Sequence, residues 1–335
     1  MDCDDADPYR ALYCSDGVAD WTALDVLPQA LSSTAAVLDP GNQRLLVYGG
    51  QSYHEVSDVL YEYDLSTTSW AALSPGGVDP GARLAASAVF DEADSRLWFF
   101  GGQEYNALSD EVFTLDAAVV GSESWTLLPV ASRAPDPRLG AATVLDIPGD
   151  RMLVIGGQGY HGLLDDVWAL DLTTTTAASW TELAPSGTAP ERAFSAAVYD
   201  PNYDVVYLLG GETYHALADD PQCLDLSGST PTWSSLTTTG DTLPPLAGAS
   251  AVWADDFGGA LVHGGATYHQ LSSTSYLLQP TDNCQVEVTA LISSGDDPGP
   301  AVNASMIWNP SDAVGVLLGG ESYYRLNDNV TEVVP

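Results

Sequence analysis

Residues 44–58 read RLLVYGGQSYHEVSD, and the chain repeats this pattern at a regular interval. Residues 96–110 (RLWFFGGQEYNALSD) and 151–165 (RMLVIGGQGYHGLLD) are close copies. The double glycine at the centre of the pattern occurs six times, 52 to 55 residues apart, at Gly49-Gly50, Gly101-Gly102, Gly156-Gly157, Gly210-Gly211, Gly264-Gly265 and Gly319-Gly320. A fixed period near 50 residues indicates repeated supersecondary units, each of which buries its faces against its neighbours.

Each repeat has the composition of four short strands. Runs rich in Val, Leu, Tyr and Trp alternate with turns rich in Pro, Gly, Asp and Ser, and no segment keeps a helical period. Four strands in a period of about 50 residues predict one blade of a β-propeller. The double glycine suits the end of the second strand, because a residue without a Cβ can adopt positive φ and pack closely.

These features resemble the kelch repeat: a small-residue strand, an apolar strand that ends in Gly-Gly, an aromatic strand that ends in Asp, and then a Trp. All six units keep this spacing across residues 20–335. The resemblance implies an all-β, six-bladed kelch-type β-propeller.

The two ends of the chain complement each other. The last repeat stops at Val333-Val334-Pro335 without a Trp strand, whereas residues 20–24 (DWTAL) match the SWxxL pattern that begins at Ser69. We therefore predict that the final blade is closed by an N-terminal strand, which removes an open sheet edge. This organisation predicts one propeller domain, residues 20–335, after an acidic segment, residues 1–19.

The chain is strongly acidic. It has nine basic residues, all arginine, against 46 acidic ones, and a net charge of −37. Such a charge repels nucleic acid and anionic membranes at long range, and no apolar run approaches the roughly 20 residues of a membrane span. We expect neither nucleic-acid binding nor membrane insertion. A salty or calcium-rich exterior and a genomic composition bias both explain the absence of lysine.

The four cysteines form an even set, as expected for two disulfides in an oxidising compartment. We favour Cys3–Cys14 with Cys223–Cys284, because the first pair closes a short acidic loop outside the repeats; other pairings stay open. No signal peptide follows Met1, which is typical of a mature or recombinant start. These features predict a secreted or cell-surface protein.

The acidic N-terminus offers a candidate metal site. Its sequence resembles the DCDDxDP segments described as metal-binding repeats in secreted bacterial proteins. Carboxylates are hard oxygen ligands that suit Ca²⁺, so calcium is the cofactor that these residues predict. The alternative is a solvated, disulfide-tied cap. The candidate ligands are Asp2, Asp4, Asp5 and Asp7.

A second candidate site is the loop that follows each double glycine. Equivalent positions hold a tyrosine and then, in most repeats, a histidine: Tyr53-His54, Tyr105-Asn106, Tyr160-His161, Tyr214-His215, Tyr268-His269 and Tyr323-Tyr324. Three interpretations stay open. The tyrosine packs over the double glycine of its own blade, the ring of residues stacks against a sugar or peptide, or Tyr and His bind a transition metal such as copper. Galactose oxidase-like enzymes, which also use kelch blades, ligate copper with a Tyr-His pair among other residues.

A third candidate breaks the symmetry of the repeats. The same position holds arginine in three successive repeats and an apolar residue in the others: Arg83, Arg138 and Arg192 against Leu31, Leu246 and Ala301. In kelch propellers this position often lines the channel mouth. A guanidinium suits carboxylate or sulfate, which predicts an anion-facing patch. Pairing of each arginine with a neighbouring acidic residue is the alternative.

The chain carries no GxSxG, HExxH or phosphate-binding loop. We therefore expect a secreted recognition or adhesion module that binds an anionic glycan, an acidic peptide or another protein segment at the propeller mouth. A copper-dependent oxidoreductase is one alternative. A surface protein that assembles with copies of itself and is stabilised by Ca²⁺ is another.

Overall fold

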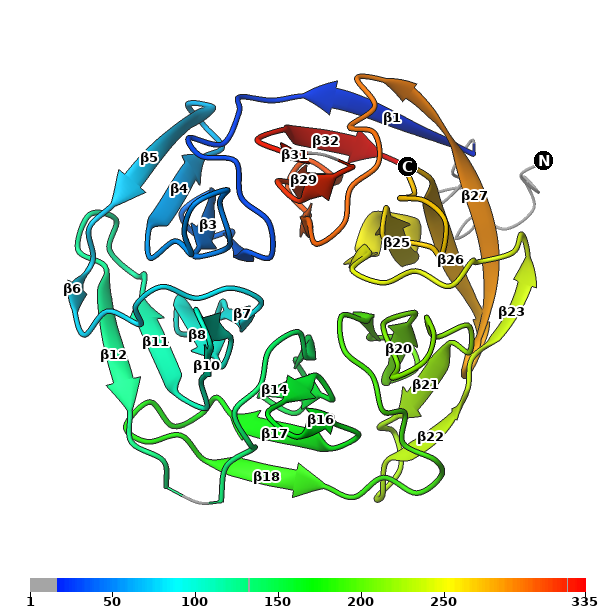
Figure 1. Ribbon diagram of the computed structural model, residues 1–335, viewed down its shortest axis with the longest axis horizontal. Coiled ribbons are helices and arrows are strands. Elements are labelled where there is room, and N and C mark those ends of the chain that lie inside the picture. Colours follow the sequence, from blue (N-terminus) through cyan, green and yellow to red (C-terminus); the bar gives the residue numbers. More distant parts are fainter. Residues whose placement is uncertain (1–16, 132, 324) are drawn as a thin grey trace.

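The computed structural model describes residues 17–131, 133–323 and 325–335. The strands form a ring of small sheets around a central axis, and the chain runs once around it (Figure 1). The described residues contain one helical turn, η1 (Asp255–Phe257), and are otherwise strands and loops. The predicted all-β propeller is confirmed.

Strand pairing groups the described residues into six four-stranded blades. Blade 1 is β2 (Ala35–Asp39), β3 (Arg44–Tyr48), β4 (Leu60–Asp64) and β5 (Ser69–Leu73). Blade 2 is β7 (Ser87–Asp91), β8 (Arg96–Phe100), β11 (Val112–Asp116) and β12 (Ser124–Leu128). Blade 3 is β13 (Ala142–Asp146), β14 (Arg151–Ile155), β17 (Val167–Asp171) and β18 (Trp180–Leu183). Blade 4 is β19 (Ala196–Asp200), β20 (Val205–Leu209), β21 (Gln222–Asp225) and β22 (Thr232–Ser235).

Blade 5 is β24 (Ser250–Ala254), β25 (Gly259–His263), β26 (Ser275–Asp282) and β27 (Gln285–Gly295). Blade 6 is β28 (Ser305–Asn309), β29 (Val314–Leu318), β32 (Val330–Val334) and β1 (Val18–Ala23). Two short strands, β6 (Gly76–Gly77) and β23 (Thr237–Gly240), pair in parallel with the outer strands β12 and β27. Small hairpins lie between second and third strands: β9 (Gln103–Glu104) with β10 (Ala107–Leu108), β15 (Gln158–Gly159) with β16 (Gly162–Leu163), and β30 (Glu321–Ser322) with β31 (Arg325–Leu326).

The N-terminal strand closes the last blade, as predicted. Strand β1 pairs antiparallel with β32, with Trp21 opposite Val333, and the two lie side by side in Figure 1. The same strand pairs in parallel with β27, so blades 5 and 6 share one continuous sheet. Both edges of β1 are therefore satisfied, and the ring has no open seam there.

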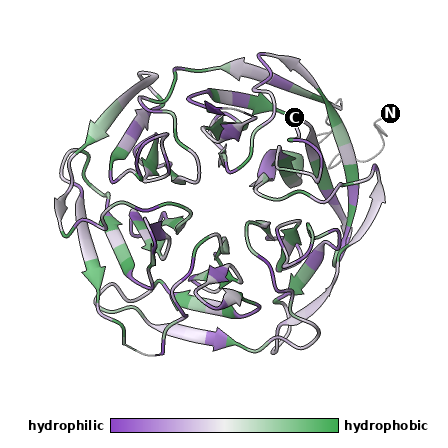
Figure 2. Ribbon diagram, in the orientation of Figure 1, coloured by the Kyte–Doolittle hydropathy of each residue, from purple (hydrophilic) through white to green (hydrophobic). Residues whose placement is uncertain are grey.

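The hydrophobic core lies between blades. Six clusters of buried apolar residues are found in the described chain, and each is shared by two adjacent blades. In β3, Leu45 faces blade 6 and Leu46 faces blade 2, because successive side chains of a strand point to opposite faces. Figure 2 shows hydrophobic residues spread around all the blades rather than gathered in one place. A single blade therefore has no core of its own.

A closed cycle of backbone hydrogen bonds surrounds the channel. Each blade contributes one residue, which lies just before its first strand. The amide of this residue donates to the carbonyl of the equivalent residue in the preceding blade, at 2.8 to 2.9 Å. All six residues have left-handed φ between +50° and +62°, a conformation that costs about 1 kcal/mol for residues with a side chain. The cycle consists of Ser33, Ala85, Gly140, Phe194, Gly248 and Asn303.

The double glycines join each blade to the next. The amide of Gly50 donates to the carbonyl of Arg83 in blade 2 at 2.7 Å, and the other blades repeat this bond. A Cβ on Gly49 would lie 2.3 Å from the same carbonyl, and one on Gly50 would lie 2.6 Å from the Thr34 side chain. Both glycines therefore serve close packing between backbones, in addition to their positive φ.

The Cys223–Cys284 disulfide is present and ties β21 of blade 4 to the turn between β26 and β27 of blade 5. This pair confirms one of the two predicted bridges. The other, Cys3–Cys14, and the proposed calcium ligands Asp2, Asp4, Asp5 and Asp7 lie outside the described residues.

A buried histidine packs beneath the closing strand. The His263 ring lies 4.9 Å from the Trp21 ring, with Nδ1 2.9 Å from Ser275 Oγ and Nε2 3.3 Å from the Gly299 carbonyl oxygen. Burial lowers the pKa of His263 to about 4. The folded protein therefore holds this residue neutral at physiological pH.

We predict a pH-dependent loss of stability from His263. Its pKa in the folded state lies below the value near 6.5 of the unfolded chain, so the unfolded chain binds more protons as the pH falls through this window. Between pH 7.5 and 5 the wild type should lose about 2 kcal/mol more than His263→Gln in urea unfolding. Both proteins contain the same carboxylates, so the contribution of these groups to the pH dependence cancels in the comparison. Parallel profiles of stability against pH for the two proteins would refute this role of His263.

Candidate functional site

Six tyrosines stand on one face of the ring, in the loops between second and third strands. We call them the tyrosine rim: Tyr53, Tyr105, Tyr160, Tyr214, Tyr268 and Tyr323. Each side chain keeps 53 to 68 % of its surface exposed, which is unusual for a large aromatic residue. The tyrosines occupy equivalent loops of successive blades, so they lie around one rim, as the repeat pattern predicted.

The tyrosine hydroxyls fix the orientation of the rings. The Tyr214 hydroxyl accepts a hydrogen bond of 2.7 Å from the amide of Leu163 in blade 3. The same bond to the preceding blade occurs for Tyr160, Tyr268, Tyr323 and Tyr53, at 2.6 to 3.1 Å. The hydroxyl contact is thus made with the preceding blade. Each of these five tyrosines links two blades and keeps more than half of its surface exposed to solvent.

The neighbouring rim residues are solvent-exposed. His54, His161, His215, His269 and Asn106 are all exposed, and their side chains make no hydrogen bond within the described part of the chain. Tyr324 lies outside the described residues.

A small cavity opens at the centre of the rim. It has a volume of about 140 Å³ and is lined by the residues of the hydrogen-bond cycle and those that follow them. Most of these side chains are small, such as Ala86 and Ala141; the largest is the Phe194 ring, which packs on Gly140. The channel mouth can therefore admit water or one small side chain, and the rim offers far more contact surface.

The three arginines lie beneath the surface and are paired with carboxylates. Arg138 is almost fully buried, with Nη1 and Nη2 at 2.6 and 2.8 Å from the two carboxylate oxygens of Asp166. Arg192 lies 2.9 Å from Asp220, and Arg83 binds Glu111 and Glu104 at 2.9 and 3.3 Å. The carboxylates are more exposed than the guanidinium groups, so an approaching ligand meets negative charge first. This arrangement favours pairing of each arginine with a neighbouring acidic residue over an anion-facing patch.

The repeats themselves contain the signal for this pairing. The position 28 residues after each arginine holds an acid, and the same position in the other blades does not: Glu111, Asp166 and Asp220 against Val59, Thr274 and Asn329. Arginine and acid therefore occur together or not at all. Comparison of the blades at two positions would have predicted the ion pairs from the sequence.

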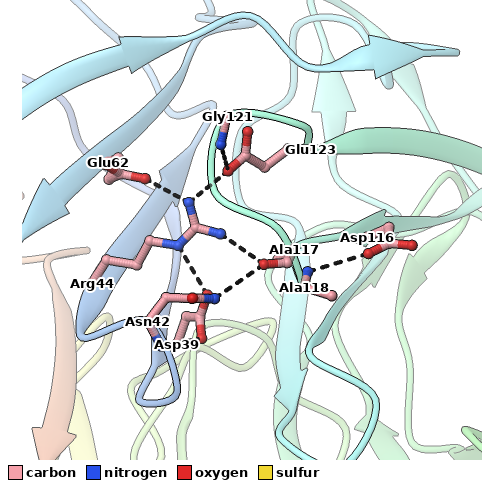
Figure 3. A network of polar contacts seen from close by, with 9 residues as sticks. All are labelled: Asp39, Asn42, Arg44, Glu62, Asp116, Ala117, Ala118, Gly121 and Glu123. Carbon is pink, nitrogen blue, oxygen red and sulfur yellow. Dashed lines mark hydrogen bonds and ion pairs between the residues drawn. The ribbon is translucent and has the colours of Figure 1, made fainter.

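A buried charge network that the repeat pattern did not predict lies between blades 1 and 2. Arg44 donates to Asp39 at 2.9 Å and to Glu62 and Glu123 at 2.6 Å each (Figure 3). Burial acts to lower the pKa of Arg44, but its hydrogen bonds to the three carboxylates outweigh this effect and raise that pKa. Burial acts to raise the pKa of Glu123, yet the bonds from Arg44 and from the Gly121 amide hold it below its usual value. Arg44 and Glu123 therefore remain charged at physiological pH.

Neither metal hypothesis gains a site in the described residues. They contain no group of three or more His, Cys, Asp or Glu side chains placed to hold a metal ion. The copper hypothesis and the calcium hypothesis for residues 2–7 therefore stay predictions. Within the same residues, no helix is long and apolar enough to cross a membrane.

The ring of four-stranded blades joined by double glycines defines a β-propeller with an exposed aromatic rim. Residues 18–198 match the family model described as the KLHDC2/KLHL20/DRC7 Kelch-repeats domain, which covers more than half of the chain. The protein belongs to the kelch-repeat family. Kelch propellers are generally protein-interaction modules.

Individual relatives share only part of their length with this chain. Multiple epidermal growth factor-like domains protein 8 of Mus musculus is 34 % identical over 123 residues, 35 % of this chain and 4 % of that protein. Adagio-like protein 3 of Oryza sativa subsp. japonica is 31 % identical over 177 residues, 52 % of this chain and 27 % of that protein. The solved structure of YjhT has a TM-score of 0.68 over 93 % of this chain and 96 % of its own, at 19 % identity, which shows a shared fold.

We predict that the arginines act mainly on stability. Arg138→Ala removes the guanidinium that donates to the Asp166 carboxylate and to the Gly156 carbonyl, and should cost about 3 kcal/mol in urea unfolding. The double variant Arg138→Leu/Asp166→Asn imitates the uncharged pairs of other blades and keeps an acceptor for the Trp168 indole. It should recover most of that loss. An Arg138→Ala protein as stable as the wild type would contradict a structural role.

Proposed function

We propose that this protein is a secreted or cell-surface recognition module that binds a segment of a partner protein across the tyrosine rim. One observation carries the proposal: six tyrosine rings stand on one face, more than half exposed, and hydrogen bonds from the adjacent blade hold at least five of them in place. Monomeric proteins seldom keep a ring of aromatic side chains exposed unless it is used for binding.

The rigidity of the rim favours recognition. Tyrosine is enriched among the residues that dominate binding energy, because it offers a large amphipathic surface with few rotatable bonds. A side chain that is already ordered loses little entropy when a partner binds. The exposed histidines and Asn106 add hydrogen-bonding groups next to each ring. The family's general role in protein interaction supports the same proposal.

The proposed extracellular location rests on the disulfide. A structural bridge such as Cys223–Cys284 persists in oxidising compartments and is rare in the reducing cytosol. The strong negative charge is compatible with a soluble exterior protein. Self-assembly stabilised by Ca²⁺ remains a separate hypothesis, for which no contact in the described residues offers support.

The rim proposal predicts a difference between removing the ring and removing the hydroxyl. Peptides would first be selected on the wild type from a random display library at physiological salt. The triple variant Tyr160→Ala, Tyr214→Ala and Tyr268→Ala should bind a selected peptide at least about tenfold more weakly, since truncation of central aromatic residues has such effects. The matched Tyr→Phe triple variant keeps the ring faces and should bind within about threefold of the wild type.

Stability is the control for this experiment. The Phe variants lose one hydrogen bond to the neighbouring blade at each site, which should cost about 1 kcal/mol each. If the Ala variant folds but binds selected peptides as the wild type does, or if no peptide is enriched, the rim is only a structural clasp between blades.

The anionic-ligand hypothesis has its own test. An acidic peptide or sulfated glycan at the arginines has to displace carboxylates that already occupy the guanidinium groups. If such a ligand is bound there, Arg138→Leu/Asp166→Asn should abolish binding of poly-glutamate or a heparin oligosaccharide without loss of folding. Equal binding by the wild type and this variant would locate the anion elsewhere or show that none is bound.

A further inference from the structure

The face opposite the tyrosine rim carries grooves between neighbouring blades. Two of them lie between the turn that joins the first two strands of one blade and, in the next blade, the same turn and the end of the third strand. The groove between blades 2 and 3 has a volume of about 530 Å³, within the range of pockets that bind ligands. The equivalent groove between blades 6 and 1 has a volume of about 180 Å³.

The groove between blades 2 and 3 combines an apolar floor with an acidic rim. Leu145, Ile147 and Leu172 supply apolar surface, and Ile147 keeps 65 % of its side chain exposed. Four carboxylates surround it: Asp91, Glu92, Asp94 and Asp150. The residues that line the groove include no arginine or histidine. Such a lining fits a group that is apolar along its stem and cationic at its end.

At the adjacent seam, between blades 1 and 2, an arginine of the protein itself occupies the equivalent position. The Arg44 guanidinium reaches from blade 1 to blade 2 and donates to the Ala117 carbonyl at 2.9 Å, and Asn42 donates to the same oxygen at 3.1 Å (Figure 3). Glu123 of blade 2 neutralises the guanidinium. An arginine side chain thus joins the two blades through carboxylates and a carbonyl.

The groove between blades 2 and 3 lacks this internal arginine. Asp94 takes the position of Asn42 and cannot donate, and Leu172 takes that of Ala117. Arg96, the counterpart of Arg44, turns toward its own blade, with Nη1 3.5 Å from Thr114 Oγ1 and Nη2 3.8 Å from Asp116. The result is an open groove with surplus negative charge where the neighbouring groove holds a guanidinium.

We propose that the groove between blades 2 and 3 binds an arginine side chain from a basic segment of a partner protein. The aliphatic stem lies on Leu145, Ile147 and Leu172, and the guanidinium takes Asp94 and Asp150 as acceptors. The net charge of −37 speeds the approach of a basic partner, and the groove determines where its arginine side chain binds. This second surface is independent of the tyrosine rim and of the function proposed for it.

The test uses the peptide Ac-Gly-Leu-Arg-Leu-Gly-NH₂ and the same peptide with citrulline, which keeps the shape of arginine without its charge. Binding to the whole protein is followed by TROSY NMR at physiological salt. We expect shifts that gather at the amides of Ile147, Asp150 and Leu172, and at least about tenfold weaker binding of the citrulline peptide, as for the loss of a charge-assisted hydrogen bond.

A matched pair of variants separates the groove from general electrostatics. Asp94 and Asp312 occupy the same turn position in blades 2 and 6, so Asp94→Asn and Asp312→Asn change the charge equally. Asp94→Asn should weaken binding about tenfold and Asp312→Asn by less than about twofold. Equal effects, equal binding of the citrulline peptide, shifts scattered over the acidic surface, or no shifts up to about 1 mM peptide would each overturn the proposal. Binding to the rim can fail or succeed without altering any of these results.

Discussion

The closed cycle of backbone hydrogen bonds around the channel is the constraint on which the other contacts depend. Each of its six residues donates to one neighbour and accepts from the other, so no blade can shift without breaking two bonds. Four of the six are not glycine and still adopt left-handed φ. Their strain, about 1 kcal/mol each, persists because the cores between blades hold the backbone in place. The tyrosine rim and the arginine pairs lie directly around this cycle.

Much of this fold could be predicted from the chain because its determinants are local and repeated. The double glycines and the Trp strands recur at fixed spacing, and the unmatched DWTAL segment predicted the closing strand that pairs with β32. The cycle itself could not be predicted. Ser33, Ala85 and Phe194 have no common residue type, and none of them favours left-handed φ, so only the assembled ring explains their conformation.

The candidate sites were harder to interpret than the fold, because a side chain's partner decides its role. The position of Arg138 at the mouth suggested a ligand site, but its two hydrogen bonds to Asp166 already satisfy the guanidinium. The spacing of the tyrosines predicted that they share one face, yet their hydroxyl contacts with the preceding blade depend on how the blades dock. Sequence periodicity places residues on a face; it does not tell which neighbour they touch.

Where the blades differ, the differences indicate where function can reside. A propeller of equivalent blades presents the same contact six times, and a partner that binds one point needs a feature that is not repeated. Arg44 bonds across the seam between blades 1 and 2, whereas Arg96 bonds within its own blade beside the groove between blades 2 and 3. The different direction of this arginine, together with Asp94 and Leu172 in place of Asn42 and Ala117, distinguishes the acidic groove from the linked seam. The structural arginine and the proposed ligand arginine follow the same chemistry, since both satisfy carboxylates at the seam between two blades.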